Sequence, residues 1–117
     1  MSELKTAKQS PRMESGQLCW YRGDTFTLYL KLSLADQDGQ PITLTREDLV
    51  NLTFLDRNDR TLREFTFNGS QVTGNTVELN VDPELSALFT PGAYRLDVRV
   101  VHGNRVTIVK DSPIKVE

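Results

Sequence analysis

The clearest pattern in the sequence is the alternation of apolar and polar residues in the segment 25–35, TFTLYLKLSLA. Phe26 and the four leucines that follow it at every second position would share one face of a strand, with Tyr29 and Lys31 on the other face. An α-helix would scatter these five apolar residues around its circumference, so the period of two outweighs the weak strand preference of leucine. The segment therefore predicts a strand with one buried face.

Similar segments recur along the chain, with turn signals such as Asp38-Gly39 and Asn68-Gly69 roughly every eight to twelve residues. The apolar positions expected to share one face in these later segments are Val50, Leu52 and Phe54; Val77, Leu79 and Val81; and Tyr94, Leu96, Val98 and Val100. The strand at 61–67 has an ambiguous facing, because Phe65 and Phe67 lie on one side and Leu62 on the other. Seven or eight short strands at this spacing are typical of a β-sandwich.

Two short helical turns are expected between strands. Asp82 fits an N-cap and Pro83 the first helical position, before an apolar stripe. The stripe consists of Leu85, Leu88 and Phe89. Thr45 and Asp48 resemble a weak capping pair and predict a second single turn. Both are too short for crossover helices of a parallel sheet, so the predicted class is all-β.

Tyr94 narrows the predicted fold. Immunoglobulin-like sandwiches often carry a tyrosine near the start of the penultimate strand, and its hydroxyl bonds to backbone upstream. Here Gly92 and Tyr94 follow a turn, and a carbonyl within residues 85–90 is the expected acceptor. We therefore predict an immunoglobulin-like β-sandwich of seven to eight antiparallel strands with one or two short helical turns, in which Gly92 and Tyr94 form a structural corner.

Length and composition set the domain boundaries and exclude several functions. The 117 residues suit one domain. Residues 1–16 are polar and lack periodicity, so they are predicted to be a flexible arm before a domain at 17–117. With 14 Lys and Arg against 16 Asp and Glu, no basic excess favours nucleic acid. A single cysteine allows no intrachain disulfide.

No segment has the length and apolar character of a membrane span or of a secretory signal, so we expect a soluble chain that is not exported. The same observation disfavours a secreted adhesion module.

Two motifs are better explained as turns than as binding sites. Arg22-Gly23-Asp24 matches an integrin-binding triplet, but it lies between two predicted strands, where a glycine turn is expected. The segment 36–47 places Asp36, Asp38, Gln40 and Glu47 at calcium-loop positions, yet Pro41 stands where that loop needs glycine. We expect no metal site.

Candidate catalytic residues are few. His102 is the only histidine and falls in a predicted hairpin turn, while Cys19 lies in an apolar strand where cysteine is usually part of the core. A Cys19–His102 pair in space is not excluded by their sequence separation. Asp56 and Asp59 lie in a turn that favours aspartate for backbone reasons. We predict no enzymatic activity, no cofactor and no catalytic residue.

Aromatic residues offer a different surface. Tyr29 points away from the predicted core, and Trp20 or Tyr21 must point outward if the other points inward. Together they would form a sugar-stacking platform or an anchor for a protein partner, the alternative being ordinary cross-strand packing. A carbohydrate- or ligand-binding sandwich is the alternative function.

Several motifs also follow the order of a known family. Gly23-Asp24-Thr25 precedes a long alternating strand, Asp38-Gly39 makes a turn, Leu44-Thr45 precedes a short helical turn, and Gly92-Ala93-Tyr94 follows a helix. Over about residues 18–117 the chain thereby resembles the immunoglobulin-like N-terminal domain of phage baseplate upper proteins.

This resemblance implies a phage or prophage tail or baseplate structural module that docks to other virion proteins, and it allows a homo-oligomer. It implies a location in the virion, or in the host cytoplasm during assembly. Larger members of that family continue into segments that trimerise and hold receptor-binding proteins. Such a segment is not matched here, so no receptor role is carried over.

Overall fold

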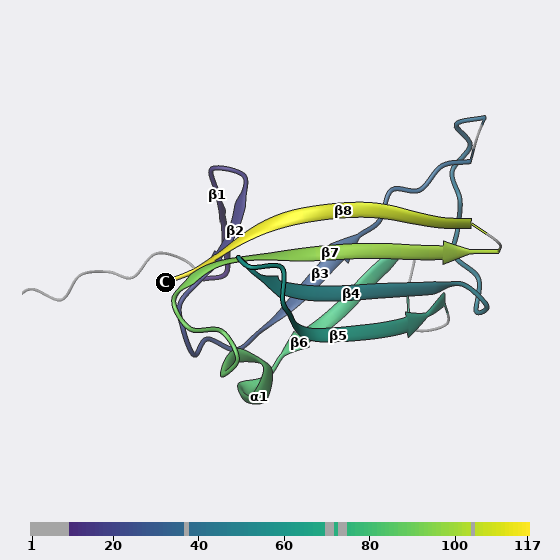
Figure 1. The fold of residues 1–117 in the computed structure, drawn as a ribbon. Coiled ribbons are helices and arrows are strands. Elements are labelled where there is room, and N and C mark those ends of the chain that lie inside the picture. The colour runs from purple at the N-terminus through teal and green to yellow at the C-terminus, as the bar shows by residue number, and fades with distance from the viewer. Residues whose placement is uncertain (1–9, 37, 70–71, 73–74, 104) are drawn as a thin grey trace, which may run out of the picture.

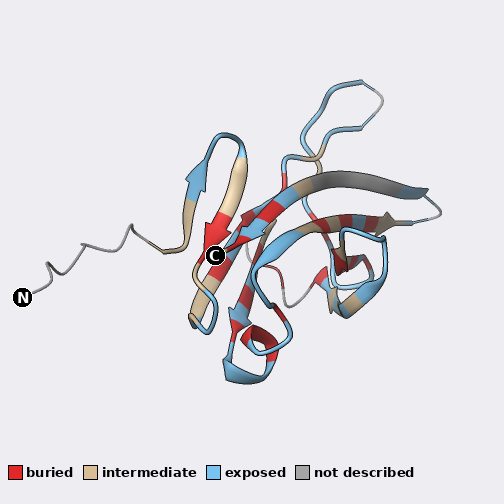
Figure 2. Ribbon diagram, turned by 60° about the vertical axis from the view of Figure 1, so that its left-hand side comes forward, coloured by how far each residue is buried: buried red, intermediate tan, exposed pale blue. Residues whose placement is uncertain are grey.

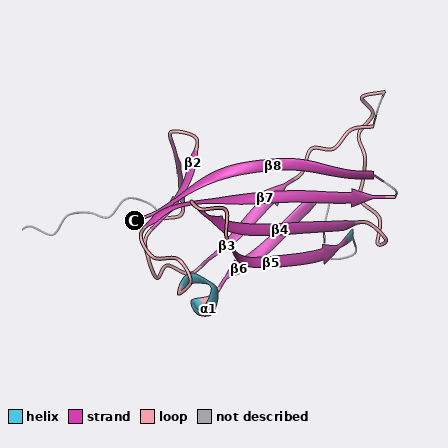
Figure 3. Ribbon diagram, viewed as in Figure 1, coloured by secondary structure: helices cyan, strands magenta, loops and turns pink. Residues whose placement is uncertain are grey.

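The computed structural model describes residues 10–36, 38–69, 72, 75–103 and 105–117, and of residues 107–111 the backbone alone. Within these residues the chain forms eight strands and one short helix (Figure 1). Their bounds are β1 Arg12–Glu14, β2 Gln17–Trp20, β3 Phe26–Lys31, β4 Leu49–Asp56, β5 Thr61–Asn68, β6 Thr76–Val81, α1 Pro83–Ser86, β7 Gly92–His102 and β8 Arg105–Val116. The all-β class is confirmed, and strands dominate the fold in Figure 3.

The strands form two sheets. Six strands pair in the order β1-β2-β8-β7-β4-β5, and β3 pairs with β6 in a separate two-stranded sheet. All pairs are antiparallel except β2 with β8, which run parallel from Leu18 opposite Ile114 to Trp20 opposite Val116. The expectation of a purely antiparallel sandwich is therefore wrong at this point, and the larger sheet is mixed.

The core lies between the sheets and is built by the alternating residues. On β3, Leu28 and Leu30 are buried and Tyr29 between them is exposed, as the period of two predicts. The inward residues of β4, β6 and β7 are buried in the same way, giving the alternating colours along the strands in Figure 2. Trp20 and Phe54 both pack edge-on against Phe89, with ring centroids 5.3 Å apart.

The structure resolves the ambiguous facing of the strand at 61–67 and differs from two local expectations. A register shift between Phe54 and Leu55 places an extra residue on β5, so Leu62 packs against the core together with Phe65. Leu88 is 40% exposed, because α1 ends before it. Around Asp48 the chain makes a turn in place of the expected second helical turn, so α1 is the one helix within the described ranges.

The helix α1 begins as the sequence predicts. The carboxylate of Asp82 accepts a hydrogen bond from the Leu85 backbone N–H at 2.8 Å, and Pro83 is the first helical residue. Leu85 and Phe89 lie one helical turn apart and are both buried, so this short element closes one end of the core.

The N-terminal boundary differs from the predicted one. Residues 12–14, which the sequence places in a polar arm, form β1 and pair with β2. Residues 1–9 of the predicted arm lie outside the described residues. The sequence of β1 shows no apolar alternation that would have predicted a strand, because its one apolar residue, Met13, lies between two charged residues. In the structure Met13 is 68% exposed, so this strand does not contribute to the core.

Candidate functional site

The three aromatic residues considered for one surface have different environments in the structure. Trp20 is only 1% exposed and packs in the core. Tyr29 is 65% exposed on the outer face of the two-stranded sheet, whereas Tyr21 follows β2 and lies under the Arg12 guanidinium, 5.6 Å from its ring centre. Trp20 therefore does not contribute to the predicted aromatic surface, and Tyr21 and Tyr29 are the two residues that remain for it. Trp20 turns inward because β2 pairs with β8 in the larger sheet. The four residues of β2 are too few to show this pairing in the sequence.

Tyr94 ties the start of β7 to the segment before it. Its hydroxyl donates to the Thr90 carbonyl at 2.7 Å and lies 3.2 Å from the Thr90 hydroxyl. Its ring packs edge-on against Phe89 at 5.0 Å. The acceptor falls within residues 85–90, where we expected it, although Tyr94 is half-buried and the hydrogen bond lies at the surface. Gly92 is the first residue of β7, two positions before this contact.

The Arg22-Gly23-Asp24 triplet forms the turn before β3. The Asp24 N–H donates to the Tyr21 carbonyl at 3.0 Å, and Gly23 has a φ of 85°, which favours glycine. One oxygen of the Asp24 carboxylate accepts hydrogen bonds from the Ser10 hydroxyl and, at 3.3 Å, from the Tyr21 N–H. This carboxylate is thus engaged inside the protein, which agrees with a structural turn.

The residues laid on a calcium loop also form a turn. One Asp36 carboxylate oxygen accepts from the backbone N–H groups of Asp38 and Gln40, both at 2.9 Å. Asp56 does the same for Asn58 and Arg60, at 2.8 and 3.0 Å. The Arg60 N–H, and after it the Asn58 N–H, lower the pKa of Asp56 by stabilising its charged form. These aspartates organise backbone, as expected for turns.

Asp48, which the sequence singles out as the partner of Thr45 in a capping pair, is a buried carboxylate next to the start of β4. Asp48 is 3% exposed, and one of its oxygens accepts from the Thr45 N–H at 2.8 Å and lies 2.9 Å from Nδ1 of His102. Burial acts to raise the pKa of Asp48, but the hydrogen bonds from Thr45 and His102 outweigh it and the pKa is lowered. The Asp48 carbonyl also accepts from the Gly69 N–H at 2.9 Å. The pair anchors two loops against the end of β7.

Cys19 and His102 lie far apart. Cys19 pairs with Lys115 on β8, and Lys115 pairs with Ala93 near the start of β7. His102 is the last residue of β7, nine positions after Ala93, which at about 3.3 Å per residue is roughly 30 Å along the strand. The two side chains cannot share one reaction, so the Cys19–His102 pair left open by the sequence is excluded by the topology.

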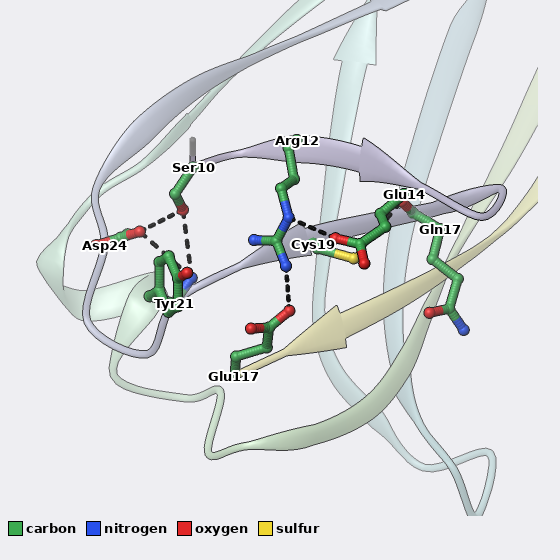
Figure 4. A network of polar contacts seen from close by, with 8 residues as sticks. All are labelled: Ser10, Arg12, Glu14, Gln17, Cys19, Tyr21, Asp24 and Glu117. Atoms are coloured by element: carbon green, nitrogen blue, oxygen red, sulfur yellow. Dashed lines mark hydrogen bonds and ion pairs between the residues drawn. The ribbon is translucent and has the colours of Figure 1, made fainter. Parts of the chain in front are cut away.

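A network of polar contacts lies around Arg12 (Figure 4). Its Nε donates to Glu14 at 2.8 Å and its Nη2 to Glu117. The side chain of Arg12 is 11% exposed, and its pKa is raised, chiefly by the hydrogen bond to Glu14 and, against the opposing effect of burial, by Glu117. The Cys19 thiol lies beneath, 3.7 Å from the Gln17 carbonyl oxygen.

This cluster also contains a geometric candidate for a metal site. Ligand atoms of Glu14, Cys19 and Glu117 lie within 4.8 Å of one another. Both carboxylates, however, already bind the Arg12 guanidinium, which supplies the positive charge that a metal ion would bring. The donor set therefore fits an ion-pair network, and we assign it a structural role. The sequence offered one indication of this network, the opposite charges of Arg12 and Glu14 at alternate positions of a strand. Because both residues lie in a segment that is polar throughout, their charges did not stand out.

The outer face of the larger sheet carries a shallow depression of about 280 Å³. Its lining residues from β4, β5 and β7 are Asn51, Thr53, Leu55, Glu64, Asp97, Val98 and Arg99. The Asn51 amide oxygen accepts from the Thr66 hydroxyl at 2.8 Å, and Asp97 accepts from Arg95 at 3.1 Å. The surface is polar and without an aromatic side chain in its lining, so it lacks the stacking face of a sugar site.

No protein-family model and no curated protein sequence matches the chain. Among the residues with described coordinates, no helix has the length and apolar character needed to cross a membrane.

Proposed function

We propose that this protein is a non-enzymatic structural module of a phage or prophage tail or baseplate, and that it acts by docking to neighbouring virion proteins. The observation that carries the docking part is the two-stranded sheet. Within the described chain β3 pairs with β6 alone, so each of these strands has one edge without a partner strand. Unpaired strand edges present backbone donors and acceptors that can bind a further strand.

We further propose that the sandwich is immunoglobulin-like. The hydroxyl of Tyr94 bonds to the backbone four residues upstream, as in the tyrosine corner of such domains. The two sheets close over one core, and the turn before β3, the Asp38-Gly39 turn and the helix before Gly92 occur in the order that the baseplate resemblance requires. These features support the assignment of a virion role through that resemblance.

The edge of β3 is the better docking surface of the two. β3 has two exposed side chains, Lys31 and Tyr29, and Tyr29 offers a large amphipathic ring near the centre of the strand. The opposing edge strand, β6, carries Glu78 and leads directly into α1. Each of the two edge strands carries one exposed charged side chain, Lys31 on β3 and Glu78 on β6, so charge does not distinguish them. The exposed aromatic ring of Tyr29 is what favours β3 as the docking edge.

Binding to purified tail and baseplate proteins encoded next to this gene tests the proposal. We expect at least one of them to bind, and Tyr29→Lys to weaken the complex by about tenfold or more, because it removes the aromatic ring and places a second positive charge beside Lys31 on the pairing edge. Tyr29 is 65% exposed, so the fold should tolerate the change. Arg99→Ala, on the outer face of the other sheet, is the matched control and should leave affinity unchanged. Absence of binding to every such protein at about 100 μM contradicts the proposal.

A further inference from the structure

The strand β1 is attached to the rest of the protein in an unusual way. Among the described strands it pairs with β2 alone. The paired residues are Arg12 with Cys19, Met13 with Leu18, and Glu14 with Gln17. Met13 is 68% exposed, so β1 buries little apolar surface. It is held by its backbone ladder and by the ion pair between Arg12 and Glu117, which comes from the end of β8 (Figure 4).

The connection between β1 and β2 is short and strained. It consists of Ser15 and Gly16, with φ of 52° and 78°. Two positive φ angles define the type I′ hairpin turn, which favours asparagine followed by glycine. Serine has a Cβ and disfavours this conformation, and straightening the turn relieves it. Short hinges under strain favour exchange of an element between two copies of a chain.

The register of the hairpin makes such an exchange self-complementary. Ser15 and Gly16 lie at the centre of the β1–β2 pairing. If the turn is straightened, two copies of the segment align antiparallel about that centre, and Ser15 of one copy falls opposite Gly16 of the other. Every pair of the hairpin then forms twice and the hinge residues extend the ladder without a gap. The hairpin projects from the end of the larger sheet with its turn pointing away from the body (Figure 1), so a straightened β1 leads away from its own domain.

We propose that two copies of this protein exchange β1, each strand pairing with β2 of the other copy. The contacts of Ser10 with Asp24 and of Arg12 with Glu117 then join one copy to the body of the other. The two larger sheets become one continuous sheet, related by a twofold axis at the hinge. This inference deepens the proposed function, on which it rests for its biological setting, because it supplies the contact between copies that a structural module requires.

Cys19, the single cysteine, allows a direct test. Arg12 and Cys19 are directly opposed, and opposed residues of antiparallel strands have Cα atoms about 4.5–5.5 Å apart, within the range that a disulfide spans. The variant Arg12→Cys is refolded from about 1 μM to about 1 mM and then oxidised with glutathione disulfide. We expect a disulfide-linked dimer whose share rises with concentration, and mapping of a mixture of light and isotope-labelled chains should place each bond between different copies.

Arg12→Ser is the control, since it removes the same ion pair without adding a thiol and should give no linked dimer. Disulfides confined to single chains at every concentration overturn the proposal. So does a dimer whose disulfides are intramolecular, because the copies then meet at another surface.

Hinge variants test the exchange where Arg12→Cys does not fold. Ser15→Asn suits the turn better and should raise the dimer dissociation constant about tenfold, roughly threefold for each of two hinges. Gly16→Val opposes the positive φ and should lower that constant by at least as much. Sedimentation equilibrium of the two variants and the natural chain measures the three dissociation constants, which should be highest for Ser15→Asn and lowest for Gly16→Val. Equal dissociation constants, or the mass of one chain for all three at about 1 mM, overturn the proposal. These assays use the purified chain alone, so their failure is distinct from a failure to bind tail proteins.

Discussion

The substitution Tyr94→Phe removes one oxygen and leaves the rest of the corner in place. The lost hydroxyl donates to the Thr90 carbonyl at 2.7 Å and also lies 3.2 Å from the Thr90 side-chain oxygen. The phenyl ring keeps the edge-on contact with Phe89, whose centroid is 5.0 Å away. The change therefore isolates the hydrogen bond from the packing, and the expected effect is the net free energy of that bond.

An intramolecular hydrogen bond of this kind contributes about 0.5–1.5 kcal/mol to the free energy of unfolding. Tyr94 is half-buried, so water can reach the Thr90 carbonyl after the substitution, which removes the additional penalty of a buried unsatisfied acceptor. We expect a loss of about 1 kcal/mol, equivalent to a decrease in Tm of roughly 3–6 °C for a domain of this size.

Urea denaturation followed by the fluorescence of Trp20 measures the effect. Trp20 is the single tryptophan and is 1% exposed, so unfolding changes its environment strongly. Tyr29→Phe is the matched control, because Tyr29 is 65% exposed and its hydroxyl makes no hydrogen bond to another described residue. The same midpoint for both variants, with unchanged slopes, would refute the argument that Tyr94 stabilises the entry to β7 through its hydroxyl.

Three further predictions concern single residues. Gly69→Ala would place a Cβ 1.6 Å from the Thr45 carbonyl oxygen, so we expect a loss of about 2 kcal/mol or more in denaturation, and a stability equal to the natural chain contradicts that close approach. Asp82→Ala removes the N-cap acceptor of α1 and should lower the free energy of unfolding by about 1 kcal/mol. Asp82→Asn keeps an acceptor at this position, so its free energy of unfolding should stay close to that of the natural chain. Asp48→Asn should be less stable than the natural chain at neutral pH. Since the pKa of Asp48 is lowered on folding, its charged form stabilises the fold above the unfolded pKa of about 4 and this contribution is lost as the pH falls through the folded value. The difference in free energy of unfolding between the natural chain and Asp48→Asn should therefore narrow below about pH 4, and a difference that stays constant from pH 7 to pH 3 would contradict this prediction.

The strands that alternate strictly could be predicted from sequence with the correct faces. Burial of Leu28 and Leu30 beside exposed Tyr29 follows from the pleat of one strand, and the cap of α1 by Asp82 follows from residues three positions apart. Both are local effects, decided within one element. The facing of β5 stays ambiguous in the sequence, because a register shift against β4 brings Leu62 to the core beside Phe65 and that shift depends on a partner strand.

The candidate sites depended on such partners throughout. The sequence leaves open whether Trp20 or Tyr21 points outward beside Tyr29, and the parallel pairing of β2 with β8 decides it by turning the ring of Trp20 into the core. The contact between Asp48 and His102 joins residues 54 positions apart, and no local pattern reports it.

By itself the sequence determined the all-β class, the positions of most strands and turns, and which side of each long strand is apolar. It could do so because these features arise from side-chain periodicity and from backbone preferences over a few residues. Only the tertiary structure decided the order of the strands, the mixed character of the larger sheet, the pairing of β1 with β2 and the gathering of Arg12, Glu14 and Glu117. Those features join segments up to 105 residues apart, and they form only when burial of the shared core brings the segments together.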